Sequence, residues 1–455
     1  MGTDDQVLAV ADGHLLFDGA DLVALAGQSE TPFFVFSERR LRANVADLLN
    51  AFRRRHAATE MFFASKACSN LWFLQVVREA GANVEVNAGG ELEKALRVGF
   101  RPEQIVFNGV AKTRAEIERA VACGVRALIV DSLYELERIA EVAAALGRRA
   151  PVAPRIDVHV PTLTHPGLET AHGGKAGIDR DDAAAAFRRA AADPHLDPAG
   201  LHLHIGSQIT SVEPYGQALA AALDLVAEVE AAAGVRLRFL NAGGGFAVPY
   251  REAPVECHPA DYFCSQLTFA DYARVIGRAL AKRRPDLALY LEPGRSIAAT
   301  TAVLVSRVEN QKVKGLRAAD GRRVGDERWV TVDAGFNTLL EHTNYHWYYR
   351  AIVASRAAEA VDTEFRLAGP LCDGGDVYAG DGDSPYRRFP QATGVGDVIV
   401  FLDVGAYSLE MMNPYNARPR AGALAVSAAG DLLRIRRRET DAEMSAHDVS
   451  EGLGA

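Results

Sequence analysis

The sequence predicts an α/β protein, in which a (β/α)₈ barrel is joined to a second, mainly antiparallel β domain. Between residues 36 and 290, short apolar runs alternate with alanine-rich amphipathic runs, which predicts parallel strands joined by crossover helices. About eight such units fit into this stretch, which is the number that closes a barrel. An open doubly wound sheet is the alternative arrangement. Beyond residue 290, apolar runs are broken by glycine, proline and aspartate, which predicts a β domain.

The predicted barrel elements follow one another regularly. The apolar runs that predict strands are MFFASKA, NVEVNA, QIVFNG, ALIVDS, APRIDVHV, LHLHIGSQI and RFLNAGGGF. The intervening runs predict helices at residues 70–81, 90–100, 114–125, 133–147 and 215–233, because apolar side chains recur there with the helical period. We expect the barrel to span residues 36–290.

The β domain is predicted to contain residues 1–35 and 291–440. Its strands are predicted from the runs LALYLEPG, TAVLVSRVENQKV, RWVTVDAG, TEFRLAGPL, DVIVFLDVGAY and GALAVSA. The runs QVLAVAD and HLLFDG near the start have no helix between them, and we expect them to pair with this domain. Residues 441–455 are polar and contain glycine, which predicts a flexible tail.

Composition and charge argue against several classes of function. The net charge is −9, which disfavours nucleic acid as a partner. No apolar stretch approaches the roughly 18 residues that a membrane span needs, and the acidic start lacks the features of a signal peptide. The five cysteines are odd in number and show no metal-binding spacing. We therefore expect no metal, and reduced thiols in a cytoplasmic protein.

Two residues at predicted strand ends can carry acid–base or nucleophilic chemistry. Lys66 follows the apolar run at residues 61–64, and His204 lies in the run LHLHIGSQI. Reactive groups of a (β/α)₈ barrel sit at the C-terminal ends of the strands. A lysine whose stem is buried in the barrel mouth attacks carbonyls as the free amine. A solvated loop lysine and a hydrogen-bonded core histidine are the alternatives for each residue taken alone.

The residues near these strand ends indicate a site for an anion. Three consecutive glycines at 243–245 let main-chain N–H groups converge on a phosphate without interference from Cβ atoms. Ser207, after His204, adds a hydroxyl group. At a further strand end, Glu292 and Arg295 combine a carboxylate for a ring nitrogen with a guanidinium for a phosphate. A tight turn and a surface ion pair are the alternative interpretations.

In this order, the motifs resemble those of the fold type III pyridoxal-phosphate decarboxylases, and specifically the diaminopimelate decarboxylase family. The resemblance runs from FFASKA to YNARPRAGALAV and includes GLHLHIGSQI, NAGGGF, EPGR, GPLCDGGD and GAY. It implies an alanine-racemase-like barrel that binds pyridoxal 5′-phosphate and removes the α-carboxylate of an amino acid. It also implies a homodimer whose subunits share the active sites.

The resemblance implies a role for each matching residue. Lys66 would hold the cofactor as a Schiff base, His204 would stack on its ring, and Glu292 would bond the ring nitrogen. Cys372 of the partner subunit would protonate Cα after decarboxylation. The other residues that the resemblance implies for cofactor binding are Glu85, Arg155, Ser207, Gly244, Gly245, Gly294, Arg295 and Tyr407.

The match fails where the substrate's distal end is expected. The family reads approximately DAGMNDLIRPALY where this chain reads DAGFNTLLEHTNY, so Tyr345 is retained while Glu341 stands at the position of a carboxylate-binding arginine. Asp373 replaces a glutamate in the GPLCDGGD motif. Two acids suit a distal cation better than a distal carboxylate. The implied substrate-binding residues are Arg295, Glu341, Tyr345, Asp373 and Tyr407.

We therefore expect a substrate with a basic or modified side chain, of the ornithine, lysine or derivatised-diamine kind. The aromatic run at residues 345–349 could add a cation–π wall or cover a larger side chain. Decarboxylation of meso-diaminopimelate to L-lysine is the alternative, with the distal carboxylate held by Arg295 and another residue. Arg350 could supply the missing charge if the register slips. An amino-acid racemase and a non-catalytic pyridoxal-phosphate-binding protein are alternatives of other classes, which Cys372 and the attached β domain disfavour.

Overall fold

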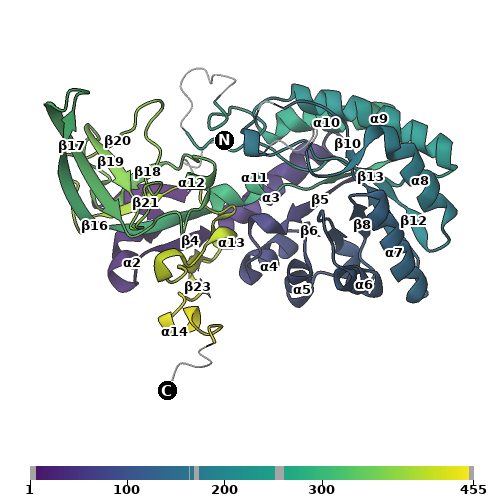
Figure 1. The fold of residues 1–455 in the computed structure, drawn as a ribbon, viewed down its shortest axis with the longest axis horizontal. Helices are drawn as coiled ribbons and strands as arrows, with labels where there is room; N and C mark the ends of the chain where they lie inside the picture. The colour runs from purple at the N-terminus through teal and green to yellow at the C-terminus, as the bar shows by residue number, and fades with distance from the viewer. Residues whose placement is uncertain (1–6, 163, 169–173, 252–260, 450–455) are drawn as a thin grey trace. The chain divides into compact units, whose positions relative to one another are not determined.

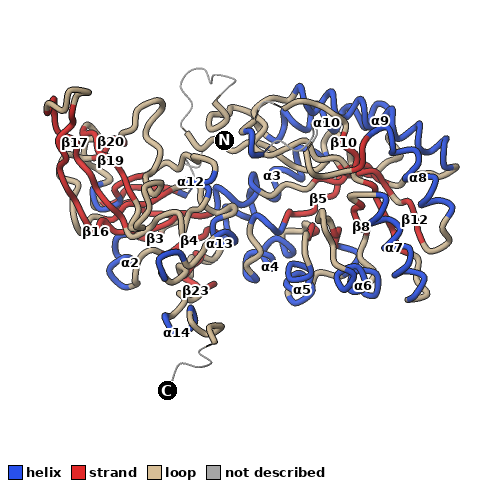
Figure 2. Tube along the Cα trace, viewed as in Figure 1, coloured by secondary structure: helices blue, strands red, loops and turns tan. Residues whose placement is uncertain are grey.

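The computed structural model of this chain describes residues 7–162, 164–168, 174–251 and 261–449. It contains two compact units, one formed by Leu41–Ala298 and the other by Gly2–Arg40 with Ala299–Ala455. The first unit combines strands with long helices, and the second consists mainly of strands, as the colours of Figure 2 show. The expected boundary at residue 290 falls inside a barrel strand, so the residues that follow it up to 298 also belong to the first unit.

The first unit is a nearly closed barrel of parallel strands. Around the barrel these are β5 (Thr59–Ala64), β6 (Asn83–Val86), β7 (Ile105–Phe107), β8 (Ala127–Val130), β9 (Ala150–Pro154), β12 (Leu196–Pro198) with β13 (Gly200–His202), β14 (Phe239–Asn241) and β15 (Ala288–Leu291). The consecutive segments β12 and β13 pair with β9 and β14, respectively. A bridge between Arg155 and His202 and the pairing of β15 with β5 complete the ring. The predicted (β/α)₈ barrel is confirmed, and the open doubly wound sheet is wrong.

Helices surround the barrel strands, as Figure 1 shows. They are α3 (Glu38–Arg53), α4 (Leu71–Glu79), α5 (Gly89–Arg97), α6 (Arg114–Cys123), α7 (Leu133–Ala145), α8 (Ala183–Ala192), α9 (Glu213–Ala233) and α10 (Phe269–Arg283). Their ends follow local sequence signals. Helix α6 begins at a capping box of Thr113 and Glu116 and ends at Gly124, whose φ of 80° favours glycine.

Apolar side chains of different sizes fill the barrel interior. The buried cluster contains Phe62, Val106, Ala127, Ile129, Ala153, Ala199, Phe239 and Tyr290. The rings of Phe239 and Tyr290 stack with their centroids 4.2 Å apart. Gly200 leaves room for this stack, because a Cβ there would lie 2.4 Å from Phe239 Cε2. The interior is therefore a packed core, and polar chemistry is left to the strand ends.

The second unit is built on a mixed sheet. Its strands, in order, are β20 (Arg387–Phe389), β19 (Thr363–Ala368), β17 (Arg323–Val332), β16 (Ala302–Arg317), β4 (Phe33–Ser37), β22 (Gly422–Val426) and β23 (Leu432–Arg436), with β21 (Val398–Phe401) paired to β16 and β18 (Ala351–Val353) paired to β21. Most pairs are antiparallel, as predicted. The pairs β17–β19 and β22–β4 are parallel.

The N-terminal runs form a sheet of their own in the second unit. Strands β1 (Leu8–Ala11), β2 (His14–Phe17) and β3 (Ala20–Asp21) pair antiparallel, and helix α2 (Leu22–Gln28) follows, capped by the Asp21 side chain. Side chains of β2 and α2 share an apolar core with β4 and β16. These runs therefore pair with one another and not with the strands of the mixed sheet. Their contact with the rest of the unit is through packed side chains and hydrogen bonds, such as that from the Ala357 N–H to the Gly13 carbonyl at 3.0 Å.

Short elements complete the two units. They are β10 (Ile156–Asp157), β11 (Ile178–Asp179), α11 (Arg295–Ala298), α12 (Glu341–Asn344), α13 (Ser408–Met411) and α14 (Asp441–Met444). Helix α14 lies in the expected flexible tail and begins at a capping box of Thr440 and Glu443. Within the described ranges, no helix combines the length and the apolar character that crossing a membrane requires.

The cysteines do not all follow the expectation of reduced thiols. Cys68, Cys123 and Cys372 are free, but Cys264 is disulfide-bonded. The expectation is therefore wrong at Cys264. A disulfide requires only that two Cα atoms lie within about 7 Å of each other in space, which the spacing of cysteines along the chain does not reveal.

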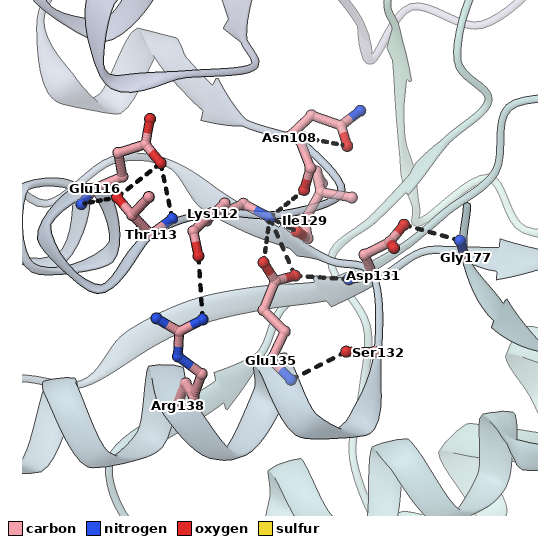
Figure 3. Close-up of polar contacts among 11 residues, drawn as sticks. Asn108, Lys112, Thr113, Glu116, Ile129, Asp131, Ser132, Glu135, Arg138 and Gly177 are labelled. Carbon is pink, nitrogen blue, oxygen red and sulfur yellow. Dashed lines mark hydrogen bonds and ion pairs between the residues drawn. The ribbon is translucent and has the colours of Figure 1, made fainter. Parts of the chain in front are cut away.

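A buried ion pair joins the ends of β7 and β8 to helix α7, as Figure 3 shows. The Lys112 ammonium donates to the backbone carbonyls of Gly109 at 2.8 Å and Ile129 at 2.6 Å. It also lies 3.1 Å from both carboxylate oxygens of Glu135, which accepts a further bond from the N–H of Asp131. Burial lowers the pKa of Lys112, and the charge of Glu135 opposes that effect. The pair anchors two neighbouring strand ends at the rim of the barrel.

Breaking this pair should destabilise the barrel. We expect Lys112→Met to lower the free energy of unfolding by about 3–5 kcal/mol, because the Glu135 carboxylate is then buried without a partner. The double variant Lys112→Met/Glu135→Leu should recover part of the loss, since no buried charge remains. Urea unfolding measures both. The control Arg114→Met removes two exposed ion pairs, with Glu118 and Glu141, and should change stability by less than about 1 kcal/mol. Equal losses in the single and double variants would contradict this interpretation.

Candidate active site at the strand ends of the barrel

Lys66 lies on a tight turn that ends strand β5. The residues Ser65–Ala67 form a single 3-10 turn directly after β5. Gly294 lets this turn pack closely against the end of β15, because a Cβ on Gly294 would lie 3.1 Å from the Cβ of Ala67. The side chain of Lys66 is exposed although its neighbours in the turn are buried. The amine is therefore accessible at the end of the strand.

Glu85 lies on β6, beside β5, and is completely buried. Its Oε2 accepts a hydrogen bond from Asn87 at 3.1 Å, whereas Oε1 has no hydrogen-bond partner among the described residues. Burial raises the pKa of Glu85 to about 8; the positive charge of Lys66 opposes the rise and the carboxylate of Glu292 adds to it. Glu85 is therefore mostly protonated at neutral pH and holds its proton near Lys66.

Glu292 follows β15 and is held by side chains from three other strand ends. Its Oε2 accepts from His202 Nε2 at 2.9 Å and from Asn108 at 3.5 Å. Its Oε1 accepts from Asn241 at 2.6 Å. Burial opposes ionisation, but the interactions with His202, Asn241 and Lys66 hold the pKa of Glu292 below its ordinary value. Glu292 is thus a buried, ionised carboxylate that can stabilise a protonated ligand atom.

The two histidines near this carboxylate are neutral. Burial lowers the pKa of His202, which therefore donates from Nε2 to Glu292 as a neutral imidazole. Burial, together with the positive charges of Lys66 and Arg155, holds the pKa of His204 well below its ordinary value. The N–H of Gly244 donates to His204 Nδ1 at 3.3 Å, which leaves the proton on Nε2.

The glycine run after β14 packs main chain against main chain. A Cβ on Gly244 would lie 2.2 Å from the carbonyl oxygen of Glu292, and a Cβ on Gly245 would lie 2.2 Å from that of Gly206. Gly245 also has a φ of 92°, which residues with side chains rarely adopt. Only glycine therefore permits this loop to run so close to the neighbouring strand ends.

Arg295 adds a cation beside the glycine run. It is 3% exposed, and it donates from Nε to the Ser207 hydroxyl at 3.3 Å and from Nη1 to the Tyr250 hydroxyl at 3.1 Å. Guanidinium, hydroxyl and main-chain N–H donors together are the chemistry that binds a phosphate. Arg155, after β9, is also buried, and burial lowers its pKa against the opposing charges of Asp131 and Glu292.

The remaining predicted residues belong to the second unit. Cys372 is an exposed free thiol in the loop after β19, and its N–H donates to Asn416 Oδ1 at 2.8 Å. Asp373 is exposed and accepts from the Tyr415 hydroxyl at 3.5 Å. Tyr407 has a φ of 62°, in the left-handed region. Such strain in a residue with a side chain is commonest at functional sites.

Glu341 lies on α12 and is 3% exposed. Its Oε2 accepts a hydrogen bond from the Tyr349 hydroxyl at 3.0 Å. Tyr348 and Tyr349 are buried and Tyr345 is half-buried, so the aromatic run packs largely inward. The cation over the Tyr348 ring is the chain's own Arg387, 4.0 Å from the ring centroid.

All the predicted residues of the first unit therefore lie at the C-terminal ends of its strands. These are Lys66, Glu85, Arg155, His204, Ser207, Gly244, Gly245, Glu292, Gly294 and Arg295. Sequence reasoning missed His202, Asn108 and Asn241, which hold Glu292, and Tyr250, which holds Arg295. A signal was present for two of them: His202 and Asn241 are polar residues at the ends of otherwise apolar strands, and such residues face chemistry or carry buried hydrogen bonds.

Known proteins resemble both units. Residues 42–299 match the family model described as "Pyridoxal-dependent decarboxylase, pyridoxal binding domain". The chain is 36% identical over 436 residues to a diaminopimelate decarboxylase of Pseudomonas aeruginosa, which covers 96% of this chain and 97% of the relative. It is 33% identical over 428 residues to that of Archaeoglobus fulgidus, at 92% and 94% coverage. The crystal structure of diaminopimelate decarboxylase from M. jannaschii with L-lysine matches with a TM-score of 0.86 and 32% identity, over 99% of both chains.

The raised pKa of Glu85 should make stability depend on pH. Glu85 has a pKa of about 8 in the folded chain and an ordinary value of 4.5, so the folded state binds the extra proton between these values. The contribution of Glu85 to stability should therefore fall as pH rises from about 4.5 to about 8. Thermal unfolding of the cofactor-free protein at pH 5 and pH 8 measures this fall.

A matched pair of variants isolates the effect. Glu85→Gln should gain stability relative to the wild type as pH rises from 5 to 8, because its amide does not titrate. Glu118→Gln, on an exposed helix face, should follow the wild type at both pH values. If Glu85→Gln followed the wild type too, Glu85 would titrate normally in the folded chain.

Proposed function

This chain belongs to the pyridoxal-dependent decarboxylases. We propose from this membership that it removes the α-carboxylate of an amino acid, and from the position of Glu341 that the side chain of this amino acid ends in a basic or modified group. The predictions of pyridoxal 5′-phosphate as cofactor and of an amino-acid decarboxylase are both confirmed by the family match. The racemase and the non-catalytic binding protein are thereby set aside. The identity of the substrate and the roles of individual residues are proposals.

The residues at the strand ends fit this cofactor chemically. Pyridoxal phosphate requires a lysine, a carboxylate for its ring nitrogen and donors for its phosphate. Lys66 is accessible, Glu292 is buried and ionised, and Arg295 stands beside Ser207. The buried Oε1 of Glu85 makes no hydrogen bond to a described residue, so it is available to a polar group of the cofactor.

We assign the following roles to these groups. The amine of Lys66 would hold the cofactor covalently, and Arg295 with the glycine loop would hold its phosphate. Glu292 would hold a proton on the ring nitrogen, because its own pKa is lowered and its position is fixed by three donors. When bound, pyridoxal phosphate provides an electron sink for the electron pair left as CO₂ departs. His204 is neutral and adds no charge that would compete with Glu292.

The proton that replaces the carboxylate is assigned to a residue of the second unit. The resemblance implies that Cys372 of the partner subunit donates a proton to Cα. In support, Cys372 is an exposed free thiol, and the backbone N–H groups of Leu371 and of Cys372 itself are both hydrogen-bonded. This role requires a homodimer, which we propose on the same ground. A cytoplasmic location is proposed from the free thiols, with the disulfide of Cys264 as the exception.

The substrate proposal is carried by Glu341. A buried carboxylate that accepts a bond from Tyr349 stands where the family pattern expects an arginine for a distal carboxylate. A second carboxylate near that position would be repelled, whereas an ammonium or a modified group would not. Decarboxylation of meso-diaminopimelate is the second candidate, because the relatives at 33–36% identity bear that name.

The reaction is tested directly by release of CO₂ from a panel of amino acids. The panel contains diaminopimelate, lysine, ornithine and arginine with their D forms. Borohydride should fix the cofactor on the peptide that contains Lys66, and Lys66→Ala should lose both the visible absorbance and several orders of magnitude in kcat. Lys282→Ala, on the exposed face of α10, is the matched control and should retain both. A label on a lysine other than Lys66 would refute the assignment.

Glu341→Arg should shift the substrate preference toward meso-diaminopimelate. An arginine would restore a charge-assisted contact to a distal carboxylate, so we expect a change on the order of a hundredfold in relative kcat/KM. The control Glu341→Gln removes the negative charge without adding a positive one, and it should weaken activity on the basic substrate without the shift. If the unmodified enzyme prefers diaminopimelate over every basic amino acid tested, the role given to Glu341 is wrong.

A further inference from the structure

A buried carboxylate network surrounds the loop that carries Cys372 in the second unit. Asp376 is 2% exposed. Its Oδ1 accepts from the N–H of Phe336 and its Oδ2 from the N–H of Leu371, both at 2.9 Å. The Nε2 of His342 lies 3.2 Å from Oδ1. Donors from three separate segments therefore converge on one side chain.

Two glycines make room for this carboxylate. A Cβ on Gly335 would lie 2.5 Å from Asp376 Oδ2, and a Cβ on Gly369 would lie 2.2 Å from the same atom. The N–H of Gly369 also donates to the Asp376 carbonyl at 2.9 Å, which closes the loop upon itself. Residues 369–376 are thus folded around the Asp376 side chain.

His342 is fixed in its turn. The residue is 2% exposed. Its ring stacks on that of Tyr378, with the ring centroids 4.3 Å apart. The Thr343 hydroxyl lies 3.3 Å from His342 Nδ1 and donates to the carbonyl of Gly375 at 3.2 Å. Helix α12 therefore holds the far end of the same loop, and it places His342 directly after Glu341.

The position of the Cys372 thiol follows from two backbone bonds. The N–H of Leu371, one residue earlier, is bound by Asp376, and the N–H of Cys372 itself is bound by Asn416. Cys372 is exposed, so packing around its own side chain is limited. The direction of the thiol depends on the main chain, and the main chain depends on Asp376.

We propose that Asp376, oriented by His342, is the positioning residue for Cys372. It acts through the N–H of Leu371 and sets the direction in which the thiol is presented. A carboxylate is required because both of its oxygens receive N–H donors, whereas an amide would turn an NH₂ group toward one of them. The inference rests on the proposed function only where Cys372 is taken to supply a proton.

Alkylation of Cys372 by iodoacetamide tests the positioning without using activity. The rate is followed in the holoenzyme by mass spectrometry of the Cys372 peptide. We expect Asp376→Asn to react about tenfold faster than the wild type, because losing one buried hydrogen bond releases the loop. The matched control is Asp397→Asn, another buried carboxylate of this unit, which accepts from Ser355, Arg356 and Gly394 and should react like the wild type.

A second variant tests the same proposal if Asp376→Asn does not fold. His342→Gln keeps the carboxylate but removes the stacked ring, and it should accelerate alkylation in the same direction by a smaller factor. An unchanged alkylation rate in the folded variant, whichever of the two is measured, overturns the proposal. Equal acceleration in Asp397→Asn also overturns it, since the effect would then be general loosening of the unit.

Activity separates this inference from the proposed function. On the panel amino acid that the wild type decarboxylates fastest, Asp376→Asn should lower kcat about tenfold with KM little changed. In a Cys372→Ala background, Asp376→Asn should cause no further loss, because it acts through Cys372. Additive losses overturn the positioning role. Full activity of Cys372→Ala instead refutes the proposed proton donor, and the alkylation rates then decide the role of Asp376 alone.

Discussion

The buried carboxylate of Glu292 is the interaction on which the candidate site depends. It accepts hydrogen bonds from Asn108 after β7, His202 at the end of β13 and Asn241 at the end of β14. These donors and Glu292 itself come from the ends of four strands. The full set of hydrogen bonds to the carboxylate therefore forms only when the barrel strands are in place. A buried charge is tolerated only when it is fully hydrogen-bonded, and any strand out of register would leave it unpaired. The ring of strands and the charge state of the site are therefore secured by the same bonds.

The two buried carboxylates of the site differ in protonation because their surroundings differ. Glu292 has three donors and a lowered pKa, whereas Glu85 has one amide donor, an orphaned oxygen and a pKa of about 8. The charge of Glu292 also discourages ionisation of Glu85, since like charges in a buried site repel. The outcome is one acid and one base near Lys66, with a neutral His204 beside them. Such a division of roles is what acid–base chemistry at neutral pH requires.

In the second unit, two residues with proposed roles lie next to each other on the short helix α12. Helix α12 carries Glu341, whose carboxylate is held by Tyr349, and His342, whose ring contacts Asp376. The proposed determinant of the substrate and the proposed support of the Cys372 loop are therefore adjacent residues. A substitution at position 341 that moves α12 would also displace the Cys372 loop, because His342 on this helix contacts Asp376.

Much of this architecture follows from the sequence by itself. The order of strands and helices, the position of Lys66 at a strand end and the glycine run at 243–245 are local patterns, because periodicity and turn chemistry act over a few residues. The cofactor and the reaction class followed from motifs in a set order. Only the tertiary structure decided that His202 and Asn241 serve Glu292, that Glu85 is protonated, that Glu341 is buried against Tyr349, and that Asp376 organises the Cys372 loop. The bonds to Glu292 join groups far apart along the chain, up to 184 residues for Asn108. Glu341 and Tyr349 are only 8 residues apart, but their burial, like that of Asp376, exists only once the strands and loops have closed around them.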